Sequence, residues 1–89
     1  MARYRWDTEK SKLVEAMRGI SSEQIVMHIE NGNVLDIVEH PNKKRYANQK
    51  VLVVNVNDYA YAVPFVEDGE DRFLKTIVPS RKLTRQYLR

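Results

Sequence analysis

The stretch VLVVNVNDYAYAVPFV, residues 51–66, carries two apolar runs on either side of Asn57-Asp58. Asn and Asp both tolerate the left-handed backbone region, so this pair is typical of a two-residue hairpin turn. We therefore predict strands over 51–56 and 59–66. The first run is apolar at nearly every position, as in a central strand. Pro64 has no backbone donor, which predicts a bulge or a local sheet edge there.

Strand-like segments also lie on both sides of this hairpin in the sequence. Residues 34–39 (VLDIVE) precede it and stop at His40-Pro41, and residues 73–78 (FLKTIV) follow a polar turn over 67–72. Residues 3–6 alternate polar with aromatic side chains, as a short strand does. The main predicted sheet is therefore four-stranded and mainly antiparallel.

Two helices are predicted before the sheet. Asp7 or Thr8 begins a helix that runs to about Arg18 and stops at Gly19, which tolerates a positive φ. Its apolar face is predicted to hold Leu13, Val14 and Met17.

Ser21 followed by Gln24 forms a capping box, which begins a second helix. This helix ends near Asn31-Gly32 and is predicted to turn Ile25, Val26 and Ile29 inward. The resulting fold class is α+β, with two N-terminal helices packed on one face of the sheet and a short basic helix at the end. Residues 1–89 form a single domain.

Composition excludes several kinds of chemistry. The chain of 89 residues is 43% hydrophobic and has no cysteine, so disulfides and thiolate catalysis are excluded and a reducing compartment is expected. No apolar stretch resembles a signal peptide or approaches the roughly 20 residues that span a bilayer, so we expect a cytoplasmic protein without membrane contact. No glycine-rich phosphate loop or Cys/His cluster is present, so no metal or cofactor is expected.

The charge of +3 is unevenly distributed, because residues 72–89 contain Lys and Arg but no acid. Ser80 is placed to cap a final helix, whose first turn would offer free N–H groups to an anion. On a helical wheel Arg81, Arg85 and Arg89 form one stripe with Lys82 beside it, while Leu83 and Tyr87 lie opposite. This pattern favours an anion-binding surface over the alternative of a solvated amphipathic helix.

The loop Lys43-Lys44-Arg45-Tyr46 interleaves cations with an aromatic ring, as RNA-binding loops do. His40 precedes it and is a candidate for acid–base chemistry, although a histidine in a turn is the commoner interpretation. The predicted sheet is also apolar on both faces, while the two helices cover one. The other face therefore requires a ligand, a partner protein or the terminal helix.

Three motifs together resemble a known family. They are the opening Arg5-Trp6-Asp7, the Gly19-Ile20-Ser21 junction between helices, and the ending Ile77-Val78-Pro79-Ser80-Arg81-Lys82-Leu83-Thr84-Arg85. This arrangement resembles the BrnT family of bacterial type II toxins, small ribonucleases related in fold to the RelE/ParE superfamily. The resemblance covers nearly the whole chain, and its middle is matched by pattern alone.

The resemblance implies a metal-independent endoribonuclease that inhibits growth. In such enzymes the ribose 2′-hydroxyl attacks the adjacent phosphate. It also implies a cognate antitoxin, of the ribbon-helix-helix DNA-binding kind, that forms a hetero-oligomer with the toxin. Arg81 matches the family's terminal arginine and is expected to stabilise the phosphate, and Lys82 and Arg85 to position the RNA backbone. The alternative is a RelE/ParE-like module that binds protein or RNA without catalysis.

Tyr87 stands where a glutamate is expected in this family, and Met17-Arg18 replace a Lys-His pair. The resemblance therefore implies no general base. The candidate catalytic residues are Arg81, Lys82, Tyr87, His40 and Lys75. The candidate RNA-binding residues are Lys43, Lys44, Arg45, Tyr46, Ser80, Arg85 and Arg89.

Overall fold

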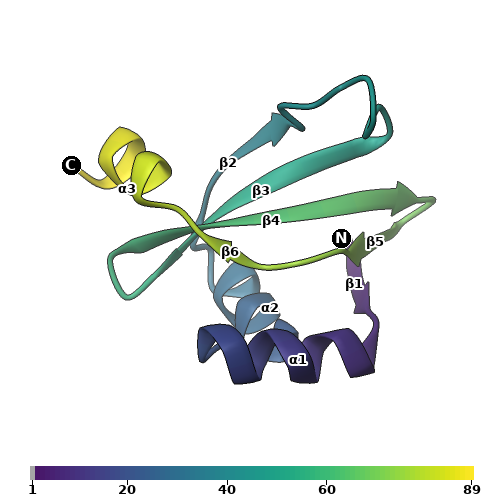
Figure 1. Ribbon diagram of the computed structural model, residues 1–89, viewed down its shortest axis with the longest axis horizontal. Helices are drawn as coiled ribbons and strands as arrows, with labels where there is room; N and C mark the ends of the chain where they lie inside the picture. Colours follow the sequence, from purple (N-terminus) through teal and green to yellow (C-terminus); the bar gives the residue numbers. More distant parts are fainter. Residues whose placement is uncertain (1) are drawn as a thin grey trace.

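The computed structural model describes residues 2–89 and has an α+β architecture with a mixed sheet (Figure 1). In chain order the elements are β1 (Arg3–Trp6), α1 (Thr8–Arg18), α2 (Ser22–Glu30), β2 (Val34–Glu39), β3 (Gln49–Val56), β4 (Tyr59–Asp68), β5 (Asp71–Leu74), β6 (Val78–Pro79) and α3 (Arg81–Leu88). The strand order is β1-β5-β4-β3-β2, and β6 pairs with β4. Within residues 2–89, no helix is long and apolar enough to cross a membrane.

The predicted hairpin is confirmed at the centre of the sheet. Val56 pairs with Tyr59, and the turn residues Asn57 and Asp58 have φ values of 53° and 66°. The side chain of Asn55 accepts a hydrogen bond from the Asp58 N–H at 3.0 Å, which holds the turn closed. β4 continues to Asp68, so the predicted polar turn over 67–72 is shorter than expected.

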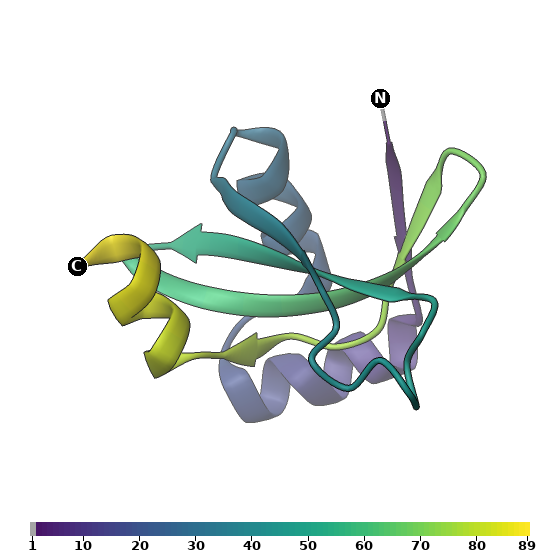
Figure 2. The ribbon, with the colours of Figure 1, turned by 90° about the horizontal axis from the view of Figure 1, so that it is seen from above.

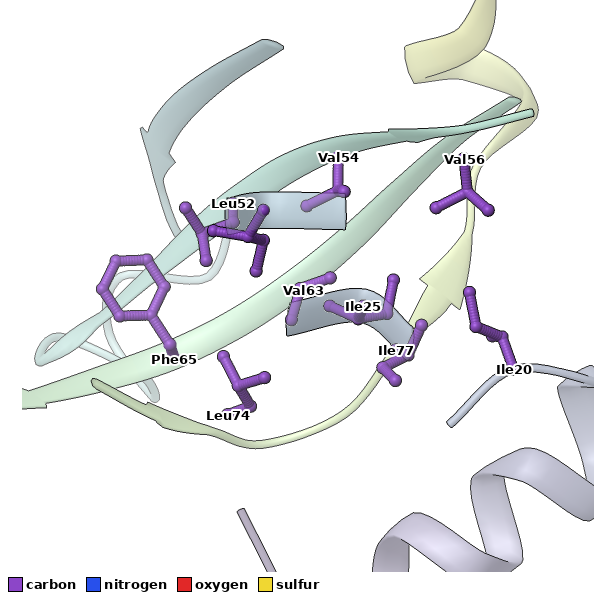
Figure 3. Close-up of a cluster of buried hydrophobic side chains, with 10 residues drawn as sticks. Ile20, Ile25, Leu52, Val54, Val56, Val63, Phe65, Leu74 and Ile77 are labelled. Atoms are coloured by element: carbon purple, nitrogen blue, oxygen red, sulfur yellow. The ribbon is translucent and has the colours of Figure 1, made fainter. Parts of the chain in front are cut away.

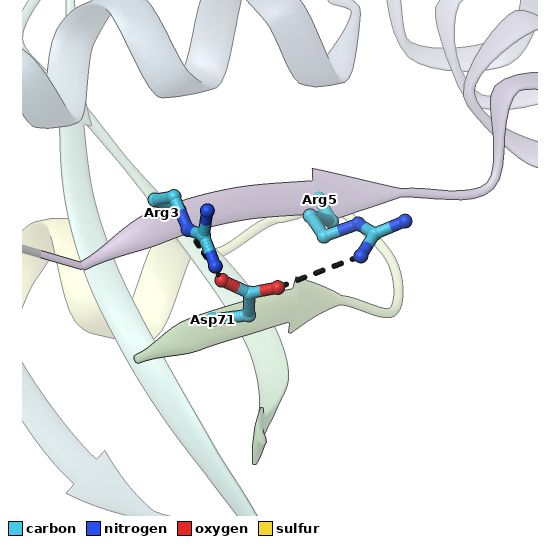
Figure 4. A network of polar contacts seen from close by, with 3 residues as sticks. All are labelled: Arg3, Arg5 and Asp71. Carbon is cyan, nitrogen blue, oxygen red and sulfur yellow. Dashed lines mark hydrogen bonds and ion pairs between the residues drawn. The ribbon is translucent and has the colours of Figure 1, made fainter. Parts of the chain in front are cut away.

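The sheet has six strands rather than the predicted four. β1 joins the edge of the sheet and runs parallel to β5, with Arg3 beside Asp71 and Trp6 beside Leu74. Asp71 also accepts hydrogen bonds from the side chains of Arg3 and Arg5, at 2.8 and 3.5 Å (Figure 4). These two arginines therefore help to hold β1 against β5 at the edge of the sheet.

The predicted continuous strand over 73–78 is wrong, because the chain leaves the sheet between β5 and β6. Hydrogen-bonded and non-hydrogen-bonded pairs alternate along β3 and β4, and Pro64 forms a non-hydrogen-bonded pair with Val51. The Pro64 nitrogen therefore points away from β3, toward β5 and β6, and it has no hydrogen to donate. Its carbonyl accepts from the Lys75 N–H at 2.8 Å. Ile77 then turns into the core, where it is 1% exposed. Pro64 thus lies at a local edge, one of the two predicted alternatives.

The predicted helix boundaries are confirmed at their caps. The Asp7 carboxylate accepts from the backbone N–H groups of Glu9 and Lys10, and Gly19 ends α1 with a φ of 74°. Ser21 and Gln24 form both bonds of the capping box. Local side-chain-to-backbone bonds therefore begin both helices where the sequence predicts.

The predicted apolar face of α1 is wrong for Leu13 and Met17, whereas Val14 is partly buried and packs against the core as predicted. Leu13 and Met17 are 65% and 78% exposed, whereas Ser11 is buried and accepts from the Ser22 N–H at 3.1 Å. Leu13 and Met17 are exposed because of where α1 lies. α2 packs on β3, and α1 lies beyond α2 on the side away from the sheet (Figure 1). The close approach of the two helices selects the small polar Ser11 at the contact.

The core lies between α2 and one face of the sheet (Figure 3). Ile25 and Ile29 of α2 are buried there as predicted, and Val26 is partly buried. The sheet contributes alternate residues, among them Leu52, Val63 and Phe65.

The opposite face of the sheet is also apolar, and α3 covers part of it. α3 lies across the sheet from α1 and α2 and packs on β4 (Figures 1 and 2). Val53 and Ala60 on this face are fully buried. The terminal helix, one of the three predicted coverings, therefore covers part of this face.

Candidate anion-binding site

Ser80 fixes the beginning of α3. Its hydroxyl oxygen accepts from the Leu83 N–H at 3.1 Å, and its own N–H donates to the Ala60 carbonyl at 2.9 Å. The predicted cap is confirmed, and the second bond ties the cap to β4. The N-terminal end of α3 is therefore held in place by its cap residue.

Thr84 is a second attachment that the sequence analysis missed. Its side chain is nearly fully buried, and its hydroxyl accepts from the Ala60 N–H at 2.9 Å while donating to the Ser80 carbonyl at 2.7 Å. The available signal was its place between Tyr87 and Leu88 on the apolar side of the helical wheel. A polar residue there indicates a buried hydrogen bond.

Tyr87 anchors the far end of α3 to β2. Its hydroxyl donates to Asp36 Oδ2 at 2.6 Å, and Asp36 Oδ1 accepts from the Ile37 N–H at 2.8 Å. The hydrogen bond to Asp36, together with desolvation and the charge of that carboxylate, raises the pKa of Tyr87. Tyr87 therefore holds its proton more firmly than a free tyrosine, which weighs against the catalytic role predicted for it.

The outward side of α3 carries the cations. Arg81, Lys82, Arg85 and Gln86 line a shallow hollow of about 540 Å³. The three cations are exposed, and within residues 2–89 no ion pair involves them. Their charge is therefore available to an anion in solution. Arg89 follows the end of the helix and does not line this hollow.

A second cavity, of about 400 Å³, lies between α3 and the end of β2. Its floor is apolar and consists of Val38, Val51, Ala62, Pro64 and Val78. Its rim is formed by His40 and Pro41 on one side and by Ser80, Lys82, Leu83 and Gln86 of α3 on the other. The structure thus brings together three candidates, His40, Ser80 and Lys82, from opposite halves of the chain.

The ring of His40 is held by the loop that follows it. Nδ1 accepts from the Asn42 N–H at 3.1 Å, and the ring packs on Tyr46 with 4.5 Å between centroids. A backbone N–H only donates, so Nδ1 must offer its lone pair, and the proton of the neutral ring resides on Nε2. Nε2 is the nitrogen left for a substrate.

The basic loop forms a neighbouring cavity rather than part of the same one. Lys43, Tyr46 and Lys50 line a hollow of about 350 Å³ together with His40. Lys43 pairs with Glu39, and this hydrogen bond and charge lower the pKa of the Glu39 carboxyl. Arg45 stacks over the Tyr46 ring, 5.4 Å from its centroid, and Lys44 is exposed. Because His40 lines both cavities, it connects the loop with α3.

Lys75 is not part of this assembly. It is exposed, its ammonium lies 5.2 Å from the centroid of the Phe73 ring, and it lines neither cavity beside α3. Its place in the gap between β5 and β6 accounts for this separation.

Within residues 2–89, no three His, Asp or Glu side chains gather where they could hold a metal ion. Comparisons of the chain with protein-family models, with curated proteins and with solved structures returned no match.

Proposed function

We propose that this protein is the RNA-cleaving toxin of a bacterial type II toxin–antitoxin system, which contacts RNA phosphates through α3. One observation carries the proposal: the free cations of α3 adjoin a cavity that His40 also lines. A cytoplasmic location and a ribbon-helix-helix antitoxin as partner belong to the same proposal and rest on the sequence resemblance.

The charge arrangement supports an RNA ligand. Arg81, Lys82 and Arg85 present three positive charges along two turns of one short helix. RNA phosphates follow one another at spacings of a few ångströms, so a row of cations can contact successive phosphates. Such contacts release counterions and weaken as salt rises.

The proposed reaction is a transesterification that needs no metal. The ribose 2′-hydroxyl oxygen bonds to the adjacent phosphorus while the bond from phosphorus to the 5′-oxygen breaks, leaving a 2′,3′-cyclic phosphate and a 5′-hydroxyl. One proton leaves the 2′-oxygen and one reaches the 5′-oxygen. Arg81 and Lys82 would stabilise the charge that develops on the phosphate oxygens. His40 is the one side chain of the cavity whose type exchanges protons near neutral pH.

A second function, RNA or protein binding without catalysis, is favoured by a different observation. Nδ1 of His40 accepts a backbone hydrogen bond, and the Tyr87 hydroxyl is bonded to Asp36. No carboxylate lines either cavity beside α3. Removing the 2′-proton through His40 Nε2 would require the other ring tautomer, in which the bond from Asn42 is lost.

Incubation of the purified protein with a mixed-sequence RNA in EDTA distinguishes the two functions. The ribonuclease proposal predicts cleavage, products with cyclic phosphate ends, and a loss of at least about 100-fold in rate in Arg81→Ala, since one transition-state donor contributes on that order. Arg18→Ala, at the exposed end of α1, is the matched control and should cleave normally. Intact RNA that is still bound would support the second function and refute the first.

A further inference from the structure

Lys82 and Gln86 form a wall that two hollows share. They line both the cationic hollow, with Arg81 and Arg85, and the apolar cavity on the other side. The two residues are four positions apart, so they lie one above the other on the helix. The border therefore separates a hollow lined by cations from a cavity with an apolar floor.

A nucleotide likewise has a charged part and an uncharged part, with its phosphate at one end and its base at the other. The apolar cavity, at about 400 Å³, lies within the range of small-ligand pockets. Its floor is an apolar surface contributed by four strands, through Val38, Val51, Ala62, Pro64 and Val78. A planar base can pack its face against apolar side chains such as these.

The rim supplies groups that can hydrogen-bond to the edge of a base. The Gln86 amide offers both donors and an acceptor, and His40 Nε2 offers a donor. The Ser80 oxygen already accepts from Leu83, which leaves its hydroxyl hydrogen to donate. Lys82 lies at the mouth and no acid lines the cavity, so the anionic phosphate attached to a bound base meets a cation and no carboxylate there.

We infer that this apolar cavity is a nucleobase pocket, which holds one unstacked base of single-stranded RNA while the α3 cations hold the adjoining phosphate. The inference rests on the proposed binding of RNA at α3. Bases in a duplex are stacked and paired, so they cannot enter the pocket. The substrate class is therefore single-stranded RNA, a loop or a strand end.

Two probes of equal charge test this inference: a short single-stranded RNA, and an oligomer of the same length whose ribose–phosphate chain lacks bases. Affinity is measured for both at low salt by fluorescence anisotropy. Burial of one base against the apolar floor should make the RNA bind about fivefold to 150-fold more tightly than the abasic oligomer, a difference of about 1–3 kcal/mol.

Filling the cavity should remove this advantage. Ala62 is half-buried in the floor, and Ala62→Leu should lower RNA affinity to that of the abasic oligomer. Ala16→Leu makes the same change on the exposed side of α1 and should retain the full advantage. Val38→Phe fills the cavity from the edge strand β2 and replaces Ala62→Leu if that variant fails to unfold cooperatively.

The outcomes separate the pocket from the proposed function. Equal affinity of the wild-type protein for the two probes, or an advantage that survives both cavity-filling changes, would overturn the base pocket and leave phosphate binding by α3 intact. Absence of binding to either probe would overturn both.

Discussion

At the scale of single residues, the Thr84 hydroxyl joins α3 to β4 by accepting from Ala60, and it also donates to the carbonyl of the cap residue Ser80. The Ala60 N–H that it accepts from is fully buried, so removal of the hydroxyl leaves that donor without a partner. The Ser80 carbonyl is affected less by loss of the hydroxyl, because it also accepts a hydrogen bond from the Thr84 N–H. The bond to Ala60 is therefore the one whose loss should be measurable.

Thr84→Val keeps the shape of the side chain and removes its hydroxyl. We expect the free energy of unfolding to fall by about 1–3 kcal/mol, the usual cost of a buried unsatisfied donor. Urea denaturation measures this change. Thr76→Val, at an exposed position between β5 and β6, should change stability by less than about 0.5 kcal/mol. A loss of the same size in both variants would argue against the role assigned to Thr84.

Tyr87→Phe removes the bond to Asp36. Because the folded protein raises the pKa of Tyr87, its contribution to stability is complete below the ordinary tyrosine value of about 10 and is lost as pH rises through the folded value. The wild-type protein should therefore be more stable than Tyr87→Phe at pH 7, and the difference should shrink above about pH 10. Thermal unfolding at several pH values measures it.

Tyr59→Phe provides the comparison for Tyr87, since the Tyr59 hydroxyl forms no hydrogen bond within residues 2–89. At pH 7 it should lower the stability less than Tyr87→Phe does. A Tyr87→Phe variant that matches the wild-type protein throughout would mean that the Asp36 bond does not hold α3.

At the scale of elements, α3 positions the cations and Ser80 determines where it begins. Ser80→Ala should cost about 1 kcal/mol through the lost cap. It should also weaken RNA binding, because a frayed first turn no longer holds Arg81 and Lys82 beside the cavity. Ser80→Thr keeps a capping hydroxyl and should restore much of both.

Ser21→Ala removes the corresponding cap of α2 and is the matched control for Ser80→Ala. The two variants should lose similar stability, and RNA affinity should fall only in Ser80→Ala. Calorimetry and anisotropy on the same samples give both quantities. An equal loss of affinity in the two variants would trace the effect to general destabilisation.

The helix caps and the central turn could be predicted from sequence because their determinants are local. Asp7, Ser21 and Ser80 bond to backbone groups within three residues of themselves. Asn57 and Asp58 likewise adopt a conformation that their own side chains tolerate. In these places a short window of sequence contains the whole physical cause.

Contacts between distant elements could not be predicted in the same way. The exposure of Leu13 and Met17 depends on α2, rather than α1, packing on the sheet. The parallel pairing of β1 with β5 depends on residues nearly seventy positions apart, as in the 68-residue separation of Arg3 and Asp71. The apolar cavity is likewise a product of four strands and a helix, so no single segment carries its signal.

At the scale of the whole molecule, the two faces of the sheet have separate roles. One face buries the core against α2, and the other carries α3, the apolar cavity and the neighbouring basic loop. The proposed RNA surface lies on the second face and leaves the core undisturbed. This separation explains why changes to the α3 cations should alter RNA binding without unfolding the protein.

The central claim is that α3 and the adjoining cavity are the surface that contacts RNA. Titration of the ¹⁵N-labelled protein with a short single-stranded RNA at low salt, followed by amide NMR signals, tests it most directly. We predict progressive shifts for residues 80–86 and 40–46, with α1 and β1 unaffected, and loss of the shifts at high salt. Shifts confined to α1 and α2, or none at all, would contradict the claim.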